Sequence, residues 1–285
     1  MTAEIGQYAL ILALMVSAVG GVLTLAGAEL ASRSWMRVGM AAAAVLAVLA
    51  TIAIGALAWG FVESDFSILN VARNSNIALP WYYKLAAVWG SHEGSILFWV
   101  TTLAWWIFAV ALSARHLPER VLARILGTLF IITFGLYLFI LTTSNPFLRL
   151  FPPAEAGADL NPLLQDPGMI FHPPLLYLGY VGFAVPFAFA VAALLGGRLD
   201  VAWARWMRPF CAEMYLWQHR IIPALRLKHR SGSCRTSLAV SALRIMRYCP
   251  IIRSIPQKSF TDNINCAAST PPGGLQSTLY RAILQ

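Results

Sequence analysis

The sequence predicts an all-α integral membrane protein, a bundle of about five transmembrane helices joined by two long external loops. Hydrophobic residues make up 59% of its 285 residues and charged residues only 12%, whereas soluble domains are usually about 25% charged. Five apolar runs are long enough to cross a bilayer as a helix, which takes about 20 residues. Together these observations exclude an ordinary soluble domain.

The five apolar runs alternate with polar connections along the first 195 residues. They are residues 8–28, 38–62, 96–114, 121–143 and 174–195. The first run is not expected to be a removable signal peptide, because no basic residue precedes it, Glu4 lies ahead of it, and it is longer than a signal-peptide core. We therefore count it as a retained span.

Two consecutive prolines, Pro173 and Pro174, stand at the start of the fifth run. Proline is well placed at the first position of a helix, because that position needs no backbone donor and suits the fixed φ of proline. The sequence therefore predicts a helix that starts at Pro173 or Pro174, with His172 just outside it.

Basic residues gather in the connections that follow the first, third and fifth runs. They are Arg33, Arg37, Arg115, Arg120, Arg198, Arg205 and Arg208. Because short cytoplasmic connections retain Lys and Arg, we expect these connections in the cytoplasm. The N-terminus and the two long loops, residues 63–95 and 144–173, are then expected in the periplasm or an equivalent compartment.

The formal net charge of +9 is concentrated in residues 211–285, which hold ten basic and two acidic residues. It therefore gives no reason to expect a nucleic-acid partner. This tail has no apolar run long enough to span and no sustained helical or strand period. Three explanations stand: a basic cytoplasmic tail that binds anionic lipid, a small soluble domain, or an aberrant continuation from a shifted reading frame. We favour the third, and expect a disordered tail.

The first external loop is rich in aromatic residues and contains the motif "WGSHEGS", residues 89–95. Gly90 and Gly94 permit a tight backbone, and His92 and Glu93 place an imidazole and a carboxylate just above the third span. An interfacial belt explains many such aromatic residues. A solvated loop pair is the simplest interpretation of His92 and Glu93.

The second external loop combines turn residues with interleaved apolar ones and ends at His172. Its length favours a functional, packed cap over a flexible linker. His172 is open to two interpretations: an interfacial histidine that hydrogen-bonds a carbonyl, or a metal or haem ligand, since neutral imidazole binds haem iron well. In the second case Phe171, Tyr177 and Tyr180 are placed to flank a porphyrin.

Four segments carry a resemblance to a known family: "NSNIALPWYYKLAAVW", "WGSHEGSILFW", "TSNPFLRLFPP" and "DLNPLLQDPGMIFHPPLLYLGYVG". They closely resemble the CcmF family of cytochrome c-type biogenesis proteins, with its CycK and NrfE members. The resemblance runs from about residue 5 to residue 209. The last segment is long and unusual enough to be decisive.

This resemblance implies a haem-lyase subunit of the bacterial inner membrane. Such a protein accepts haem from a haem chaperone and, with partner subunits, delivers it for attachment to apocytochrome c. The histidine of the family's "FHPP" motif is an external axial haem ligand, which corresponds to His172 here. His92, Trp89 and Tyr177 are further candidates for haem contact, and the family also holds a b-type haem within the membrane.

The chain also departs from the family pattern. The tryptophan-rich WWD segment, "WGxWWxWDP", does not occur in it, and the remaining ligand histidines of the family should follow where the basic tail stands. We therefore expect this chain to bind haem weakly and to lack lyase activity alone. A reading-frame shift near residue 210 is the working hypothesis for the tail.

A secondary transporter or ion-translocating membrane subunit without haem is the alternative function. Such proteins carry ionisable residues deep within their spans. Here the apolar runs offer only Glu29 beside the first run and Arg124 near the start of the fourth, where long side chains reach the interface. The sequence therefore favours haem handling over ion transport.

Overall fold

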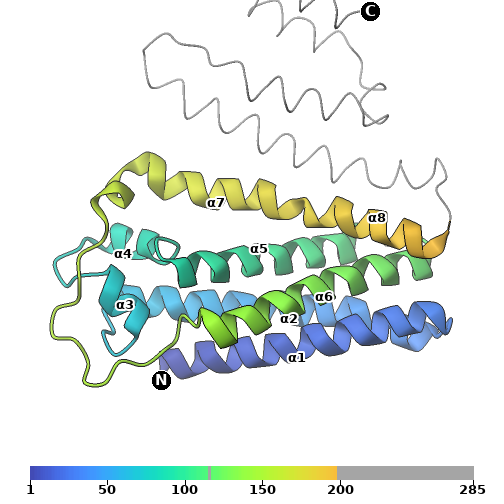
Figure 1. Ribbon diagram of the computed structural model, residues 1–285, viewed down its shortest axis with the longest axis horizontal. Coiled ribbons are helices and arrows are strands. Elements are labelled where there is room, and N and C mark those ends of the chain that lie inside the picture. The colour runs from blue at the N-terminus through green and yellow to red at the C-terminus, as the bar shows by residue number, and fades with distance from the viewer. Residues whose placement is uncertain (115–116, 198–285) are drawn as a thin grey trace, which may run out of the picture. The chain divides into compact units, whose positions relative to one another are not determined.

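The computed structural model describes residues 1–114 and 117–197, and within these ranges every regular element is a helix (Figure 1). The elements are α1 (Thr2–Glu29), α2 (Arg33–Val62), α3 (Leu69–Asn74), α4 (Trp81–Ala87), α5 (His92–Ser113), α6 (Glu119–Thr143), the short 3-10 helix η2 (Pro162–Gln165), α7 (Pro167–Gly182) and α8 (Ala184–Gly196). The tail predicted at residues 211–285 lies outside the described residues.

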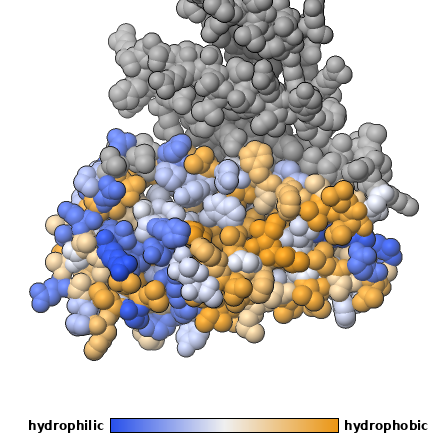
Figure 2. All heavy atoms as spheres, viewed as in Figure 1, coloured by the Kyte–Doolittle hydropathy of each residue, from blue (hydrophilic) through white to orange (hydrophobic). Residues whose placement is uncertain are grey.

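The five predicted spans are confirmed as helical segments long and apolar enough to cross a membrane. They are Thr2–Glu29, Arg33–Val62, His92–Ser113, Glu119–Thr143 and Ile170–Gly196. Figure 2 shows hydrophobic residues mostly over the middle of the bundle and hydrophilic residues at its ends. The chain is therefore an all-α, multi-pass membrane protein.

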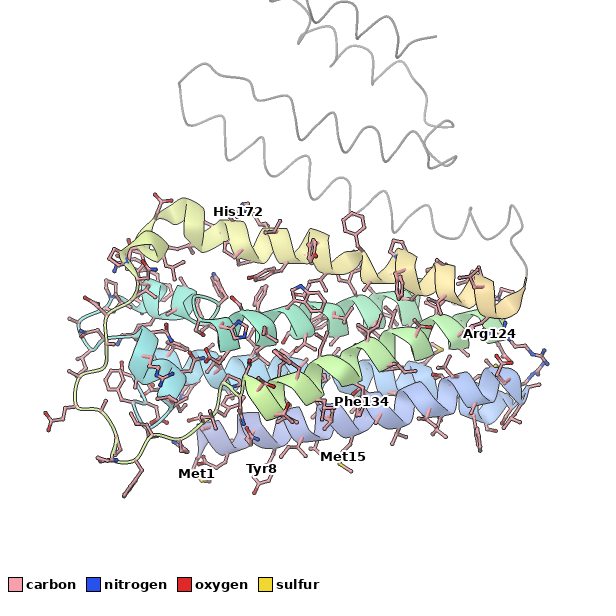
Figure 3. All side chains as sticks on the ribbon, in the orientation of Figure 1. Met1, Tyr8, Met15, Arg124, Phe134 and His172 are labelled. Atoms are coloured by element: carbon pink, nitrogen blue, oxygen red, sulfur yellow. The ribbon has the colours of Figure 1, made fainter. Side chains whose placement is uncertain are left out.

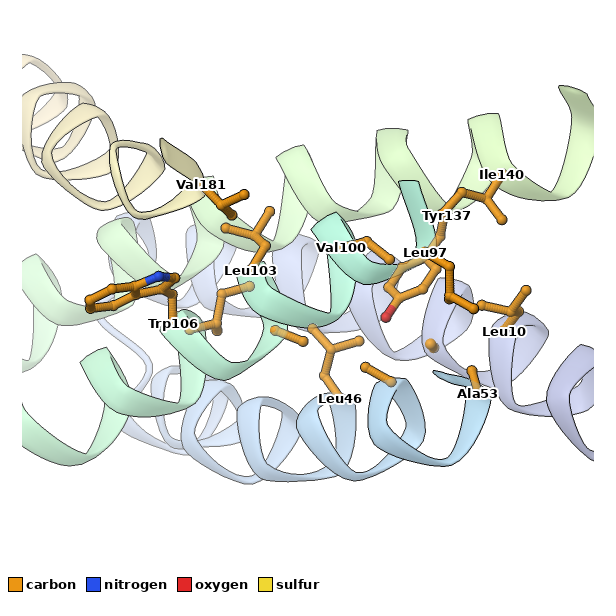
Figure 4. Close-up of a cluster of buried hydrophobic side chains, with 14 of the residues drawn as sticks. Leu10, Leu46, Ala53, Leu97, Val100, Leu103, Trp106, Tyr137, Ile140 and Val181 are labelled. Atoms are coloured by element: carbon orange, nitrogen blue, oxygen red, sulfur yellow. The ribbon is translucent and has the colours of Figure 1, made fainter. Parts of the chain in front are cut away.

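The spans form one bundle in which α1 packs against α2 and α6, and α2 also packs against α5. The fifth span changes neighbour along its length: α7 lies on α5, and α8 lies on α6 (Figure 1). The interior is apolar, with Tyr137 of α6 fully buried near Leu10, Leu97 and Val100 (Figure 4). We call the end of the bundle that holds Met1, α3 and α4 the loop end.

The second long loop is packed against the loop end, as the sequence predicts. Its backbone exchanges hydrogen bonds with the first loop: Leu69 N donates to Leu148 O and Leu150 N donates to Ser67 O, both at 2.8 Å. The Arg149 guanidinium between them pairs with Glu4 of α1 and lies 3.6 Å from an Asp65 oxygen. The two loops and the N-terminal helix are thereby tied together.

The predicted start of the fifth helix is wrong. α7 begins at Pro167, so that His172 lies inside the helix and Pro173 and Pro174 follow it in the helix interior. Pro167 takes the first helical position, where no backbone donor is needed, and Ile170 N donates to Asp166 O at 3.1 Å. The later prolines are tolerated because a side chain from outside α7, just before α5, serves the carbonyl that they leave without a donor.

Candidate functional site

His172 stands on the outer face of α7, in the half of the helix nearest the loop end. Its side chain is exposed and directed away from the bundle (Figure 3). Positions four and eight residues further on share that face of a helix, and they are Leu176, 39% exposed, and Tyr180, 60% exposed. No hydrogen bond joins the His172 imidazole to another residue of the described part of the chain. The His172 imidazole therefore lies on an exposed strip with Leu176 and Tyr180, without a hydrogen bond to another described residue.

The two prolines after His172 leave one helical carbonyl without donors. In an α-helix the carbonyl of residue 170 accepts from the N–H of residue 174, or of residue 173 in a tighter turn, and proline has no N–H at either position. The indole Nε1 of Trp89 donates to Ile170 O instead, at 3.2 Å. A side chain from outside the helix therefore replaces the missing backbone donor.

Trp89 is held in place by the motif that contains it, which we call the Trp89 hook (residues 88–95). Ser91 caps α5 by accepting from Gly94 N at 3.0 Å, the usual role of serine at this position. A Cβ on Gly94 would lie 1.7 Å from Val88 O, so only glycine lets the chain before α5 lie against its first turn. The tight backbone predicted at Gly94 is confirmed.

Tyr177 reaches the same hook from α7. Its hydroxyl donates to Ser95 Oγ at 3.3 Å, and Ser95 Oγ donates to Trp89 O at 2.7 Å. The Phe98 ring is 5.7 Å from the Trp89 ring and 5.9 Å from the Tyr177 ring, centre to centre. Five residues of helix turn Tyr177 about 140° away from His172. Tyr177 therefore faces the bundle, whereas the His172 imidazole faces outward.

His92 begins α5 and lines a cleft between α5, α6 and α7. The cleft has a volume of about 360 Å³ and is lined by His92, Ser95, Ile96, Trp99, Leu136, Phe139 and Tyr177. The His92 Nε2 atom lies 3.1 Å from Ser144 Oγ, so one ring nitrogen already has a partner. Ser144 follows α6 in the segment "TSNPFLRLFPP", where nothing in the sequence marks it as a partner of His92.

The four site residues predicted from sequence thus separate into two groups. Trp89 and Tyr177 meet at the hook, with His92 on the adjoining cleft, whereas His172 lies on the other side of α7. Sequence reasoning missed Ser95 and Phe98, which connect Trp89 to Tyr177. The described residues contain no group of three or more His, Cys, Asp or Glu that could hold a bare metal ion. A single imidazole suits a metal whose other ligands come with it, as the iron of haem comes with the nitrogen atoms of its porphyrin.

Comparison with known proteins agrees with this arrangement. The model of the family described as "Cytochrome C assembly protein" matches residues 89–243, a range that includes Trp89, α5 to α8 and His172. The chain belongs to the cytochrome c assembly protein family.

Its relatives within the family include CcmF proteins, which confirms the resemblance found in the sequence. CcmF of Pseudomonas aeruginosa is 55% identical over 211 residues, 74% of this chain and 32% of that protein. CcmF of Haemophilus influenzae is 53% identical over 219 residues, 76% of this chain and 34% of that protein. The chain therefore spans about a third of the length of these curated relatives.

A solved structure shares the fold. The protein described as "Cytochrome c Heme Lyase CcmF" superimposes with a TM-score of 0.67 at 28% sequence identity, over 76% of this chain and 34% of the other. The match covers three quarters of this chain. Membership of the cytochrome c assembly family accounts for the chain better than the alternative of an ion-transporting subunit.

Proposed function

We propose that this chain handles haem in cytochrome c biogenesis, binding it through His172 and presenting it for attachment to apocytochrome c. The observation that carries the proposal is the exposed imidazole of His172 on a helix whose opposite side is bonded to α5 through Ser95 and Trp106. The names of the relatives, a cytochrome c-type biogenesis protein and a haem lyase, support the same role.

The residues around His172 fit a haem. Neutral imidazole is a strong axial ligand for haem iron, and the imidazole has no competing partner among the described residues. Leu176 and Tyr180 extend from it along the exposed face, where they would pack against a porphyrin. On this face the described residues would supply a haem with one imidazole, that of His172. His92 is a weaker candidate, because Ser144 already occupies its Nε2 atom.

When bound, the haem supplies the vinyl groups that react with the cysteine thiols of a cytochrome. The chain's own residues then need only bind and orient, since orientation alone removes much of the barrier to a reaction between two bound partners. In this proposal His172 holds the haem at a fixed place, and α5 fixes α7. The chain alone, with one ligand histidine, is expected to bind haem weakly and to lack lyase activity.

We place the chain in a bacterial inner membrane, with the loop end and N-terminus in the periplasm and the tail in the cytoplasm. The arginines in the short connections support this orientation. Arg124, near the start of α6, lies at the end of the bundle opposite His172 (Figure 3), and Arg33 pairs with Glu119, the first residue of the same helix. His172 would then face the compartment in which a haem chaperone, partner subunits of a haem lyase and apocytochrome c would meet it.

A haem titration of the purified chain tests this proposal. We expect ferric haem to give a Soret shift with the unaltered chain, and His172→Ala to weaken binding about tenfold or more, because the axial bond is lost. His92→Ala is the matched control and should weaken binding less than His172→Ala does, because the His92 Nε2 atom already has Ser144 as a partner. An unchanged titration for His172→Ala would overturn the assignment.

A further inference from the structure

The carbonyl of Ile170 lies where two prolines interrupt the hydrogen bonds of α7. A proline inside a helix removes a hydrogen bond and its ring crowds the preceding turn, at a cost of about 3 kcal/mol. Pro173 and Pro174 together remove both backbone donors that could serve Ile170 O. The helix nonetheless continues through both prolines to Gly182, and the Trp89 indole lies 3.2 Å from that carbonyl.

We propose that Trp89 is a positioning residue for His172: its indole N–H replaces the backbone donors that Pro173 and Pro174 remove, and so fixes the turn of α7 that carries the imidazole. That the positioned imidazole serves to bind haem rests on the proposed function. The attachment itself concerns only Trp89 and α7.

Trp89 holds this turn on both sides of His172. Its indole reaches Ile170, two residues before the histidine, and its carbonyl accepts from Ser95, which accepts from Tyr177, five residues after it. The segment between Ile170 and Tyr177 is therefore held at one end by Trp89 and at the other by Ser95, which is itself bonded to Trp89. An imidazole mounted on such a segment keeps its direction without a hydrogen bond of its own.

The attachment is already built on the α5 side. The close approach of Val88 to Gly94, and the Ser91 cap, fix the backbone of Trp89. The Phe98 ring lies against the rings of both Trp89 and Tyr177. Little side-chain freedom is left for Trp89 to lose when it binds the carbonyl, so the hydrogen bond retains its full effect on α7.

A double-mutant cycle tests the attachment without haem. Trp89→Phe removes the indole donor, and Pro174→Ala returns a backbone N–H four residues after Ile170. The readout is amide hydrogen exchange of residues 175–178 in lipid nanodiscs. We expect Trp89→Phe to speed exchange about fivefold, as the loss of one hydrogen bond of about 1 kcal/mol implies. In the Pro174→Ala background the same substitution should change the rate less than twofold, because the carbonyl has its own donor.

Two controls separate the donor from the ring. Trp105→Phe removes an indole N–H that donates to Thr51 Oγ1 at 3.1 Å, and it should leave exchange in residues 175–178 unchanged. Replacement of Trp89 by benzothienylalanine keeps the ring shape but lacks the N–H, and it should reproduce Trp89→Phe. Equal effects of Trp89→Phe with and without Pro174→Ala, or no effect at all, would overturn the proposal.

Haem spectroscopy then tests the positioning. Outer groups that orient a histidine tune the metal it binds, so Trp89→Phe should shift the EPR g values of the ferric haem bound through His172, and Pro174→Ala should restore them. Unchanged g values in a variant with faster exchange would refute the positioning of His172. If no His172-dependent Soret band forms, the proposed function fails, and the exchange cycle still decides whether Trp89 fixes α7.

Discussion

Two contacts within the bundle are built from opposite materials. α1 meets α2 through small residues, so that their backbones approach closely: a Cβ on Gly27 would lie 2.9 Å from Met36 N. α7 meets α5 and the residues just before it through large aromatic side chains: the indole of Trp89, ahead of α5, donates to Ile170 O, and that of Trp106, on α5, donates to Leu178 O. The first contact depends on side chains small enough for the two backbones to approach, and the second depends on a few directed hydrogen bonds.

The difference suits what each helix does. Close packing through small residues is the common way to join helices in a membrane, where burial of apolar surface gives no driving force. A helix held by side-chain donors to its carbonyls tolerates prolines and keeps one face open, as α7 does at His172. The α1–α2 contact therefore supplies a rigid base, and the α5–α7 contact supplies an oriented mount.

The largest effect is expected from Gly94→Ala, which tests whether the mount depends on the hook. The added Cβ would overlap Val88 O at 1.7 Å, so the backbone that carries Trp89 must move. We expect a loss of about 3 kcal/mol, the upper end of overpacking effects, measured by denaturation in mixed micelles. Proteolysis should show the damage centred on residues 167–182.

Gly135→Ala is the matched control for this change, since nothing lies within 4 Å of an added Cβ at that position of α6. It should be neutral or slightly stabilising, because alanine favours helix over glycine. Damage spread evenly over all spans in Gly94→Ala would contradict a separate mount.

The next effect concerns the base. Gly27→Ala places a Cβ 2.8 Å from the Trp35 Cβ and 2.9 Å from Met36 N, and a backbone neighbour cannot turn aside. We expect α1 and α2 to separate slightly, at about 2 kcal/mol, with cooperative loss of the whole bundle in the same denaturation assay. Gly55→Ala on α2, where an added Cβ meets nothing within 4 Å, reports the gain in helix propensity alone. Equal stability of Gly27→Ala and Gly55→Ala in this assay would contradict a closely packed base.

The sequence predicts the base far better than the mount. Spans follow from apolar run length and composition, which are local properties, and all five were found within a few residues. The start of α7 was missed because the rule that places proline at a helix start is also local. What overrides this rule is a hydrogen-bond donor from elsewhere in the fold, Trp89, which lies 81 positions before its acceptor, Ile170.

The site shows the same limit. The "FHPP" resemblance led to His172, and the structure places that imidazole on an exposed helical face. Trp89 and Tyr177 were chosen as aromatic candidates for haem contact, a prediction that stays open, but their shared link through Ser95 depends on distances that no spacing rule encodes. Glycine and serine in "WGSHEGS" signal a tight turn, not the partner that the turn holds.

The smallest effect is expected at the end opposite His172, where an ion pair adds to the packing of α1 on α6. The Arg124 guanidinium donates to Glu29 Oε1 at 2.8 Å, with the arginine side chain 14% exposed and the glutamate 62% exposed. Glu29→Gln should lower stability by about 1 kcal/mol or less, since exposed ion pairs contribute little. Glu119→Gln is its control, because Glu119 meets Arg33 at 3.5 Å and Arg37 at 4.0 Å with every partner well exposed, and it should be close to neutral. A loss for Glu29→Gln as large as that for Gly27→Ala would mean that the ion pair, and not close packing, holds the base together.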